Sequence, residues 1–491
     1  SIEREGKSVG IVEAVGPWAP AQVARALRTP VAQPLSPLAG EQWAGGEVGR
    51  WRTVVLYQLE RREGCDPEVI ARWIKGLKSR HDVILIDTPA LSLAGPAALD
   101  GLLEPCEWVL QLTREPGRDV LPVAAYRRQV LQVVPDGEAS PELPYIGRDI
   151  HRLPWDRSLS RHFQDSGIPW VLAKPEAHAS QVVRRLKRAI LLRQVGVALA
   201  GGGNWGFSHI GVIQVLEEQK VPIDMVAGTS AGALIGGLYA SGLSGVEIEG
   251  VILKLVGSGF LRYLIPGPFR DRTLIGGTSF ERFARDAFKG KQLTDLRVPF
   301  WPNAMDFHTG EEVVFRHGPM FHGVTAAAAL PGVLSPYSWN GRVLLDGGFV
   351  NNLPLGLLYE MGCNVSIGVN CIPHLQAPLK RVKPTLGQRM WDRVNPLEVR
   401  AVSDEPRWRP SLPILPPLAF ISTINMVMRG IQMLCHRIGE ESGRLADVYI
   451  APEVGHAQWF EFHKVGEMIS AGRRGALETL ERIHEVCPRD E

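Results

Sequence analysis

The sequence contains little cysteine, and the cysteines that it has are scattered. Six of them lie along 491 residues without a C-x-x-C pair. This spacing favours free thiols in a reducing compartment over a disulfide framework or a zinc site. Residues 1–5 (SIERE) are charged and polar, which predicts no secretory signal peptide. We therefore expect a cytoplasmic protein that needs neither a metal nor another cofactor.

The sequence also lacks a long hydrophobic run that suits a membrane-spanning helix. Residues 410–428 carry no charge, but they include Pro410, Pro413, Pro416 and Pro417. A spanning helix needs about 20 apolar residues with a continuous hydrogen-bond ladder, which these prolines interrupt. We therefore predict that this stretch does not span a membrane.

Neither sign of charge dominates. The formal net charge is +2, with 45% hydrophobic and 22% charged residues, as in soluble globular proteins. This balance gives no indication of a nucleic-acid partner, and none is expected. The length predicts two or three domains. We place them at residues 1–190, an α/β domain, at residues 191–372, a core domain that carries the motifs described below, and at residues 373–491, a Pro- and Arg-rich loop with a helical extension that completes the core domain.

The N-terminal domain alternates strand and helix patterns, which predicts a mostly parallel sheet. The stretches 30–48 and 134–144 are typical of loops. The predicted strands are residues 8–15, 52–59, 82–87 and 108–112, and the predicted helices include residues 67–78 and the basic stretch 179–192.

Residues 83–89 (VILIDTP) resemble the Walker-B strand of chromosome-partitioning P-loop ATPases. A phosphate-binding loop would have to follow the strand at residues 8–15. Residues 16–22 (GPWAPAQ) stand there instead, without a lysine and with prolines that lack N–H donors. We therefore predict a degenerate P-loop-like domain without a nucleotide site, and no ATP binding.

Residues 226–240 (VAGTSAGALIGGLYA) form the most informative stretch of the chain. They predict a strand, a sharp turn and a helix, with Ser230 at the apex between Gly228 and Gly232. The G-x-S-x-G pattern is typical of a nucleophile elbow, in which small neighbours let the hydroxyl stand clear of the backbone. The N-terminus of the following helix, starting at Ala231, favours negative charge formed during attack on a carbonyl.

A glycine-rich loop precedes this elbow, between a strand at residues 195–200 and a helix. Gly201, Gly203 and Gly206 give the spacing G-x-G-x-x-G, which also occurs in dinucleotide-binding sites. A dinucleotide site needs an acidic residue at the end of the next strand, whereas Asp224 precedes that strand. An oxyanion hole is therefore the better interpretation. Its expected backbone donors come from Gly201, Gly202, Gly203, Asn204 and Ala231.

A third motif lies far downstream, where a predicted strand ends in Asp346 followed by Gly347 and Gly348. Taken alone, an aspartate before two glycines most often forms an Asx turn. Together with the other two motifs it becomes a candidate catalytic group. A triad would need a histidine, but His209 is more typical of local packing. The downstream histidines stand in no recognisable context, so we assign no histidine to catalysis.

In this order, the three motifs resemble the patatin-like phospholipases, and residues 326–336 (AAAALPGVLSP) match the family's stretch before the aspartate. Residues 351–354 (NNLP) and 391–396 (WDRVNP) extend the resemblance to the neuropathy target esterase branch of lysophospholipases. The resemblance implies a three-layer α/β/α sandwich and a Ser–Asp dyad. In that dyad Ser230 is the nucleophile and Asp346 takes its proton. The implied activity is hydrolysis of phospholipid or lysophospholipid esters at a membrane surface.

One position departs from the family, because Trp205 stands where its members usually carry Arg or Lys. A lost cation favours an alternative, a catalytically weakened lipid-binding or scaffold protein of the same fold. A nucleotide-switched membrane-binding protein is a third reading, which depends on residues 83–89.

Candidate membrane contacts are residues 260–265, residues 412–418 and a stripe of Ile421, Ile424, Met428 and Ile431. The stripe is equally typical of core packing. The C-terminal part is predicted to contain helices at residues 419–437 and 465–484, with a strand at residues 448–451 between them.

Overall fold

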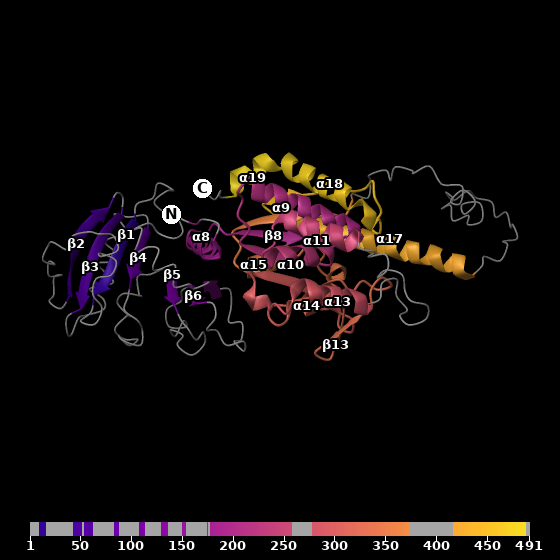
Figure 1. Ribbon diagram of the computed structural model, residues 1–491, viewed down its shortest axis with the longest axis horizontal. Coiled ribbons are helices and arrows are strands. Elements are labelled where there is room, and N and C mark those ends of the chain that lie inside the picture. Colours follow the sequence, from indigo (N-terminus) through magenta and orange to yellow (C-terminus); the bar gives the residue numbers. More distant parts are fainter. Residues whose placement is uncertain are drawn as a thin grey trace. The chain divides into compact units, whose positions relative to one another are not determined.

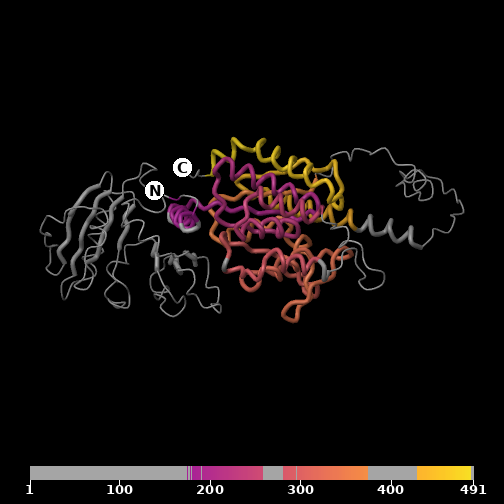
Figure 2. Tube along the Cα trace, in the orientation of Figure 1, coloured from indigo at the N-terminus to yellow at the C-terminus, as the bar shows by residue number. Residues whose placement is uncertain are grey.

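The structure is a computed structural model of the 491-residue chain (Figures 1 and 2). It describes residue 174 and residues 177–257, 277–373 and 416–487, together with the backbone of seven strands nearer the N-terminus. The chain divides into two compact units, Ser1–Leu192 and Arg193–Glu491.

The N-terminal unit contains two small sheets. In the first, with the order β2-β3-β1-β4, strand β1 is parallel to both β3 and β4, and β2 is antiparallel to β3. In the second, the neighbours in the order β5-β6-β7 are parallel. The elements are β1 (Val9–Val15), β2 (Trp43–Trp51), β3 (Val54–Arg61), β4 (Val83–Asp87), β5 (Trp108–Leu112), β6 (Gln129–Pro135), β7 (Ile150–Leu153) and helix α8 (His178–Ile190).

All four strands predicted for this unit are confirmed to within two residues, and so is the helix predicted at 179–192. The loop prediction for residues 30–48 is wrong at its end, because β2 begins at Trp43. Three glycines lower the β-propensity of this stretch, but pairing along β3 decides its conformation. Residues 16–22 and 67–78 lie outside the described residues, so the missing nucleotide site stays a prediction.

The second unit is built on one mixed sheet with the order β12-β13-β10-β9-β8-β14-β15. The strands from β10 to β15 along this order run parallel, whereas β13 and the short β11 pair antiparallel with β10. The strands are β8 (Val195–Leu199), β9 (Met225–Gly228), β10 (Phe300–Asp306), β11 (Glu312–Val314), β12 (Tyr337–Trp339), β13 (Arg342–Asp346), β14 (Val365–Val369) and β15 (Val448–Ile450).

Helices cover both faces of this sheet, as the right-handed crossover rule requires. Helices α9 and α10 connect β8, β9 and β10, which step in one direction, so both lie on one face; α18 packs against α9 there. Helix α17 connects β14 to β15, which step in the opposite direction, and it contacts α15 on the other face. The expected mixed α/β architecture is confirmed. The helices are α9 (Ser208–Glu218), α10 (Ala231–Ala240), α11 (Gly245–Gly257), α13 (Gly277–Phe288), α14 (Met320–Ala327), α15 (Leu355–Glu360), α17 (Pro416–Gly443), α18 (Val465–Glu478) and α19 (Leu480–Val486), with short 3-10 turns η4 (Gly203–Phe207), η5 (Leu293–Asp295), η6 (Gly347–Phe349) and η7 (Phe462–Lys464).

Helices α9 and α18 lie side by side in Figure 1 and approach closely through glycines. A Cβ atom added at Gly472 of α18 would collide with the Ser208 carbonyl oxygen, and one added at Gly211 of α9 would collide with the Ile469 carbonyl oxygen. Neither oxygen belongs to a side chain that can rotate away. This contact fixes the C-terminal helix against the helix that follows the glycine-rich loop.

Gly472→Ala is therefore expected to destabilise the second unit by about 3 kcal/mol, because the two helices must separate to admit one methyl group. The matched control is Gly466→Ala on the same helix, where an added Cβ meets nothing within 4 Å. This exposed control is expected to gain up to about 1 kcal/mol from helix propensity. Urea denaturation followed by circular dichroism measures both. Equal midpoints for the two variants would contradict the close contact.

The helices and the strand predicted for the C-terminal part are present, but the bounds of the helices differ from the prediction. Helix α17 is longer than the predicted 419–437, and the predicted helix 465–484 is divided at Thr479. The Thr479 hydroxyl donates to the carbonyls of Gly475 and Ala476, a bonding pattern that competes with helix continuation. Among the described residues, no helix combines the length and the apolar character that crossing a bilayer requires. Residues 260–265 and 412–415 lie outside the described part.

Candidate active site

Ser230 occupies a strained turn between β9 and α10. Its backbone angles are φ 52° and ψ −119°, a conformation that non-glycine residues rarely adopt. The Gly232 amide donates to the Thr229 carbonyl at 2.7 Å and closes the turn. A Cβ atom at Gly232 would collide with the Leu199 carbonyl oxygen of β8, so the elbow accepts only a glycine there. Ser230 is half-buried and lines a pocket.

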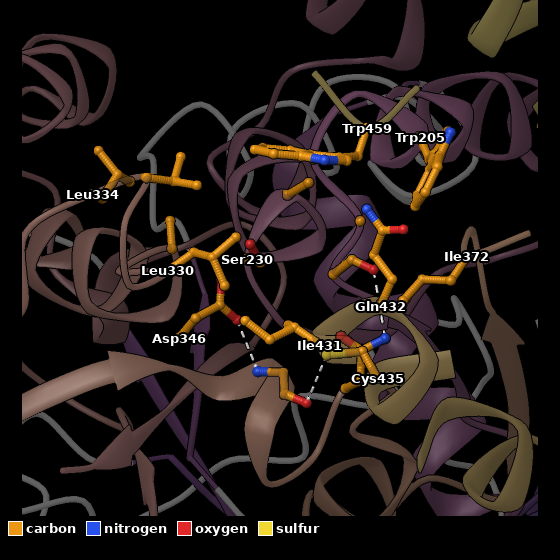
Figure 3. Close-up of a pocket in the computed structure, with 18 of the residues that line it drawn as sticks. Trp205, Ser230, Leu330, Leu334, Asp346, Ile372, Ile431, Gln432, Cys435 and Trp459 are labelled. Atoms are coloured by element: carbon orange, nitrogen blue, oxygen red, sulfur yellow. Dashed lines mark hydrogen bonds between the residues drawn. The ribbon is translucent and has the colours of Figure 1, made fainter. Parts of the chain in front are cut away.

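Asp346 ends β13 and is almost completely buried, with 3% of its surface exposed. Its Oδ1 accepts a hydrogen bond from the Gly348 amide at 2.8 Å, which is the Asx-turn bond that the local sequence predicts. The turn does not use the whole carboxylate. The Ser230 side chain lines the same pocket and acts on the pKa of this carboxyl group, so two residues far apart in the sequence meet here (Figure 3).

Burial controls the electrostatics of this carboxyl group. Desolvation raises the pKa of Asp346 from 3.8 to about 6, although the Ser230 side chain and the hydrogen bond from the Gly348 amide oppose the shift. A carboxyl group with this pKa is ionised at neutral pH and takes up a proton more readily than an exposed aspartate. This is the property that a general base needs.

The alanine-rich stretch at the C-terminal end of α14 holds both residues in place. The Ser230 amide donates to the Ala327 carbonyl at 3.1 Å, and the Asp346 amide donates to the Ala329 carbonyl at 3.0 Å. One short segment therefore sets the separation of the serine and the aspartate. The sequence identified this stretch only through the family resemblance, because nothing in a run of alanines indicates which amides its carbonyls will accept.

The structure leaves fewer backbone amides for the candidate oxyanion hole than the sequence predicts. The Gly201 amide donates to the Asn352 carbonyl at 3.3 Å, and the Asn204 amide donates to the Trp459 carbonyl at 2.8 Å, so neither is available to a substrate. In the described part of the chain, no acceptor is found for the amides of Gly202, Gly203 and Ala231. All three residues line the pocket beside Ser230, and the helix start at Ala231 leaves its amide without an intrahelical partner.

The pocket is lined mainly by apolar side chains, contributed by both faces of the unit. Besides Ser230 and Asp346, its polar side chains come from Asn352, Gln432 and the Cys435 thiol. Figure 3 shows Trp459 above the serine, Leu330 and Leu334 to one side, and Ile431 on α17 below. The apolar side chains larger than alanine are those of Trp205, Phe207, Leu234, Leu255, Phe280, Leu330, Val333, Leu334, Phe349, Ile372, Met428, Ile431, Trp459 and Phe462. Of the predicted membrane stripe, Met428 and Ile431 line this pocket.

A polar network that the sequence did not reveal lies behind the elbow. The Thr229 hydroxyl donates to Asn303 Oδ1 at 2.7 Å and to the Asn351 carbonyl at 3.0 Å. Asn303 and Asn351 each donate a side-chain amide to Glu312 Oε1, at 2.7 and 3.0 Å. The network joins the residue before Ser230 to the loop that follows Asp346. Its members come from four separate segments, so no sequence motif marks it.

No histidine lines the described pocket. His209 is completely buried behind the glycine-rich loop, where its Nε2 pairs with the Ala200 carbonyl at 2.8 Å. Burial lowers its pKa to about 4, so it is neutral at physiological pH. This placement agrees with the packing role expected for it.

Comparison with known proteins matches residues 197–359 to the family "Patatin-like phospholipase". The "Lysophospholipase NTE1" of Pyricularia oryzae is 27% identical over 317 residues, which are 63% of this chain and 20% of that protein. The protein of the same name from Candida glabrata is 36% identical over 188 residues, 38% of this chain and 11% of that protein. VipD from Legionella pneumophila, a solved structure, is 14% identical with a TM-score of 0.33, and the match covers 61% of this chain and 68% of VipD. The chain spans a fifth or less of the length of these two curated relatives.

Proposed function

Because residues 197–359 form a patatin-like phospholipase domain related to the NTE1 lysophospholipases, we propose that this chain is a serine esterase that hydrolyses acyl esters of lysophospholipids or phospholipids. One observation carries the proposal: Ser230, on a strained elbow, lines the same pocket as the buried carboxyl group of Asp346 and acts on its pKa. A serine is a weak nucleophile unless an adjacent base accepts its proton. Asp346 is that base.

In the proposed reaction, the Ser230 oxygen attacks the ester carbonyl while its proton passes to the Asp346 carboxylate. The negative charge on the carbonyl oxygen is stabilised by the amides of Gly202, Gly203 and Ala231. When the intermediate collapses, the protonated Asp346 donates its proton to the departing alcohol, and an acyl-enzyme remains. Water then attacks the acyl-enzyme while Asp346 takes its proton, and release of the fatty acid restores the Ser230 hydroxyl.

The substrate class follows from the pocket. Apolar side chains surround the serine, and an acyl chain that leaves water for such a surface gains about 0.8 kcal/mol per buried CH₂ group. Long-chain lipids reside in membranes and micelles, so the enzyme works at an interface that it contacts peripherally. This proposal includes the predicted cytoplasmic, membrane-associated location.

The test is hydrolysis by the purified chain of a panel of lysophospholipids, diacyl phospholipids and triglycerides, together with labelling by a fluorophosphonate probe. We expect release of fatty acid from at least one phospholipid class and covalent labelling at Ser230. Absence of both would refute the esterase and favour the alternative, a lipid-binding or scaffold protein of the same fold. Hydrolysis of triglycerides alone would overturn the substrate class and leave the mechanism in place.

A further inference from the structure

The glycine-rich loop is held by a segment near the C-terminus, residues 457–459, which we call the 457–459 loop. It lies between β15 and α18, and its three successive carbonyls accept hydrogen bonds from two successive residues, Asn204 and Trp205. The Asn204 amide donates to the Trp459 carbonyl at 2.8 Å, and Asn204 Nδ2 donates to the Gln458 carbonyl at 3.3 Å. The Trp205 indole donates to the Ala457 carbonyl at 2.9 Å, across 252 positions of sequence.

We call these three hydrogen bonds the clamp. Trp205 contributes to it through an indole N–H that is buried away from water. Trp205 is 3% exposed and Ala457 is 1% exposed. Water therefore cannot take the place of either partner if the hydrogen bond between the indole N–H and the carbonyl is lost. Losing the donor would leave a buried carbonyl unsatisfied, which costs more than an ordinary surface hydrogen bond. The residue that departs from the family pattern is thus part of the packing of the loop.

The 457–459 loop also packs directly against Gly203, whose amide is one of the free donors. Gly203 has φ +58°, and a Cβ atom there would lie 2.7 Å from the Trp459 carbonyl oxygen. Only glycine combines this conformation with this close approach. The position of the Trp459 backbone therefore limits where the Gly202 and Gly203 amides lie.

The side chain of Trp459 extends from the same backbone over the pocket. It packs against the apolar cluster of Ala328, Val333, Leu334 and Met428, and Figure 3 shows its ring above Ser230. One residue therefore contacts the glycine-rich loop through its carbonyl and the acyl pocket through its indole ring.

We propose that the 457–459 loop sets the geometry of the oxyanion hole, with Trp205 as the positioning residue that anchors it and Trp459 as a residue that determines which acyl chains fit. This inference rests on the proposed esterase function. Trp205 acts through Ala457 and touches no reacting atom in the mechanism above. At a position where the family usually carries Arg or Lys, its buried indole instead donates to the Ala457 carbonyl and holds the glycine-rich loop against the 457–459 loop.

The test uses the whole chain with Trp205→Phe, which removes the indole N–H and keeps an aromatic ring. Trp339→Phe is the matched control, because Trp339 lies on the edge strand β12 and lines no part of the pocket. Hydrogen–deuterium exchange of peptides that cover residues 200–207 and 454–464 reports the clamp without any need for activity. We expect about tenfold faster exchange at the Asn204 amide in Trp205→Phe and no change in the control.

Steady-state kinetics supply the second readout. Trp205→Phe is expected to lower kcat about tenfold and to change KM by less than about twofold, because misplaced oxyanion donors weaken transition-state binding more than substrate binding. Trp459→Leu keeps the backbone carbonyl and opens the pocket, so its preference among acyl chains is expected to shift toward longer or bulkier chains.

Unchanged exchange and unchanged kcat in Trp205→Phe would overturn the proposal, and so would an effect confined to KM. If Trp205→Phe does not fold, Asn204→Ala removes one bond of the clamp and is expected to accelerate exchange in the same peptides. Faster exchange in a chain whose wild type hydrolyses no ester would refute the esterase and leave the clamp standing.

Discussion

Ser230→Ala is expected to lower kcat for acyl-ester hydrolysis by about 10⁴- to 10⁶-fold and to abolish fluorophosphonate labelling. The variant removes only the attacking oxygen, while the backbone amides and the pocket remain. Enzymes that lose their nucleophile in this way keep only the residual acceleration that binding and the oxyanion hole supply. Alanine is as compatible with φ 52° as serine, so the fold is expected to persist.

The matched control is Ser241→Ala. Ser241 caps the other end of α10 and is half-buried like Ser230. Its hydroxyl donates a hydrogen bond to the Leu238 carbonyl at 2.7 Å. Its loss is expected to leave kcat and labelling unchanged. Circular dichroism and thermal melting check that both variants are folded. Wild-type rates in Ser230→Ala would remove the serine from the mechanism, whatever the pocket binds.

Asp346→Asn is the second large effect, with an expected loss in kcat of about 10³- to 10⁴-fold. The amide has nearly the same shape as the carboxyl group and still accepts from the Gly348 amide, but it cannot take the serine proton at any ordinary pH. Losses of this size follow when the group that manages the proton of a serine nucleophile is replaced. A loss of less than about tenfold would show that another base serves Ser230.

The pH dependence separates the base from a structural aspartate. Since burial raises the pKa of Asp346 to about 6, wild-type kcat/KM is expected to fall tenfold per pH unit once the pH drops below that value. Asp346→Asn is expected to lose this acidic limb. The control is Asp306→Asn, because Asp306 also closes a turn, accepting from the His308 amide at 2.9 Å, and does not line the pocket. It is expected to keep both the rate and the limb.

The same shift has a consequence for stability. The folded state binds the Asp346 proton more tightly than the unfolded chain, so protonation favours the fold. The contribution is complete below pH 3.8 and disappears as the pH rises through about 6. Asp346→Asn, which is neutral throughout, is therefore expected to be at least as stable as wild type at pH 8, so its low activity cannot be attributed to unfolding. A lower melting temperature at pH 8 would contradict this reasoning.

Several features of this chain follow from local sequence alone. The elbow around Ser230 is fixed by the need for small flanking residues, and the turn at Asp346 is fixed by the glycines that follow. The strands β8, β9 and β13 are short apolar runs whose ends carry these turns, and their positions are as predicted. Each of these predictions depends on residues within a few positions of one another, so periodicity and turn chemistry are sufficient.

The tertiary structure decided everything that depends on partners distant in sequence. It brought the Asp346 carboxylate to the Ser230 hydroxyl, and it used the amides of Gly201 and Asn204 internally, which a count of glycines cannot reveal. It also gave Trp205 a partner 252 residues away. The physical reason is that backbone carbonyls are chemically identical along the chain. Which of them lies opposite a given donor is set by how the sheet and its helices pack, and no local pattern records that.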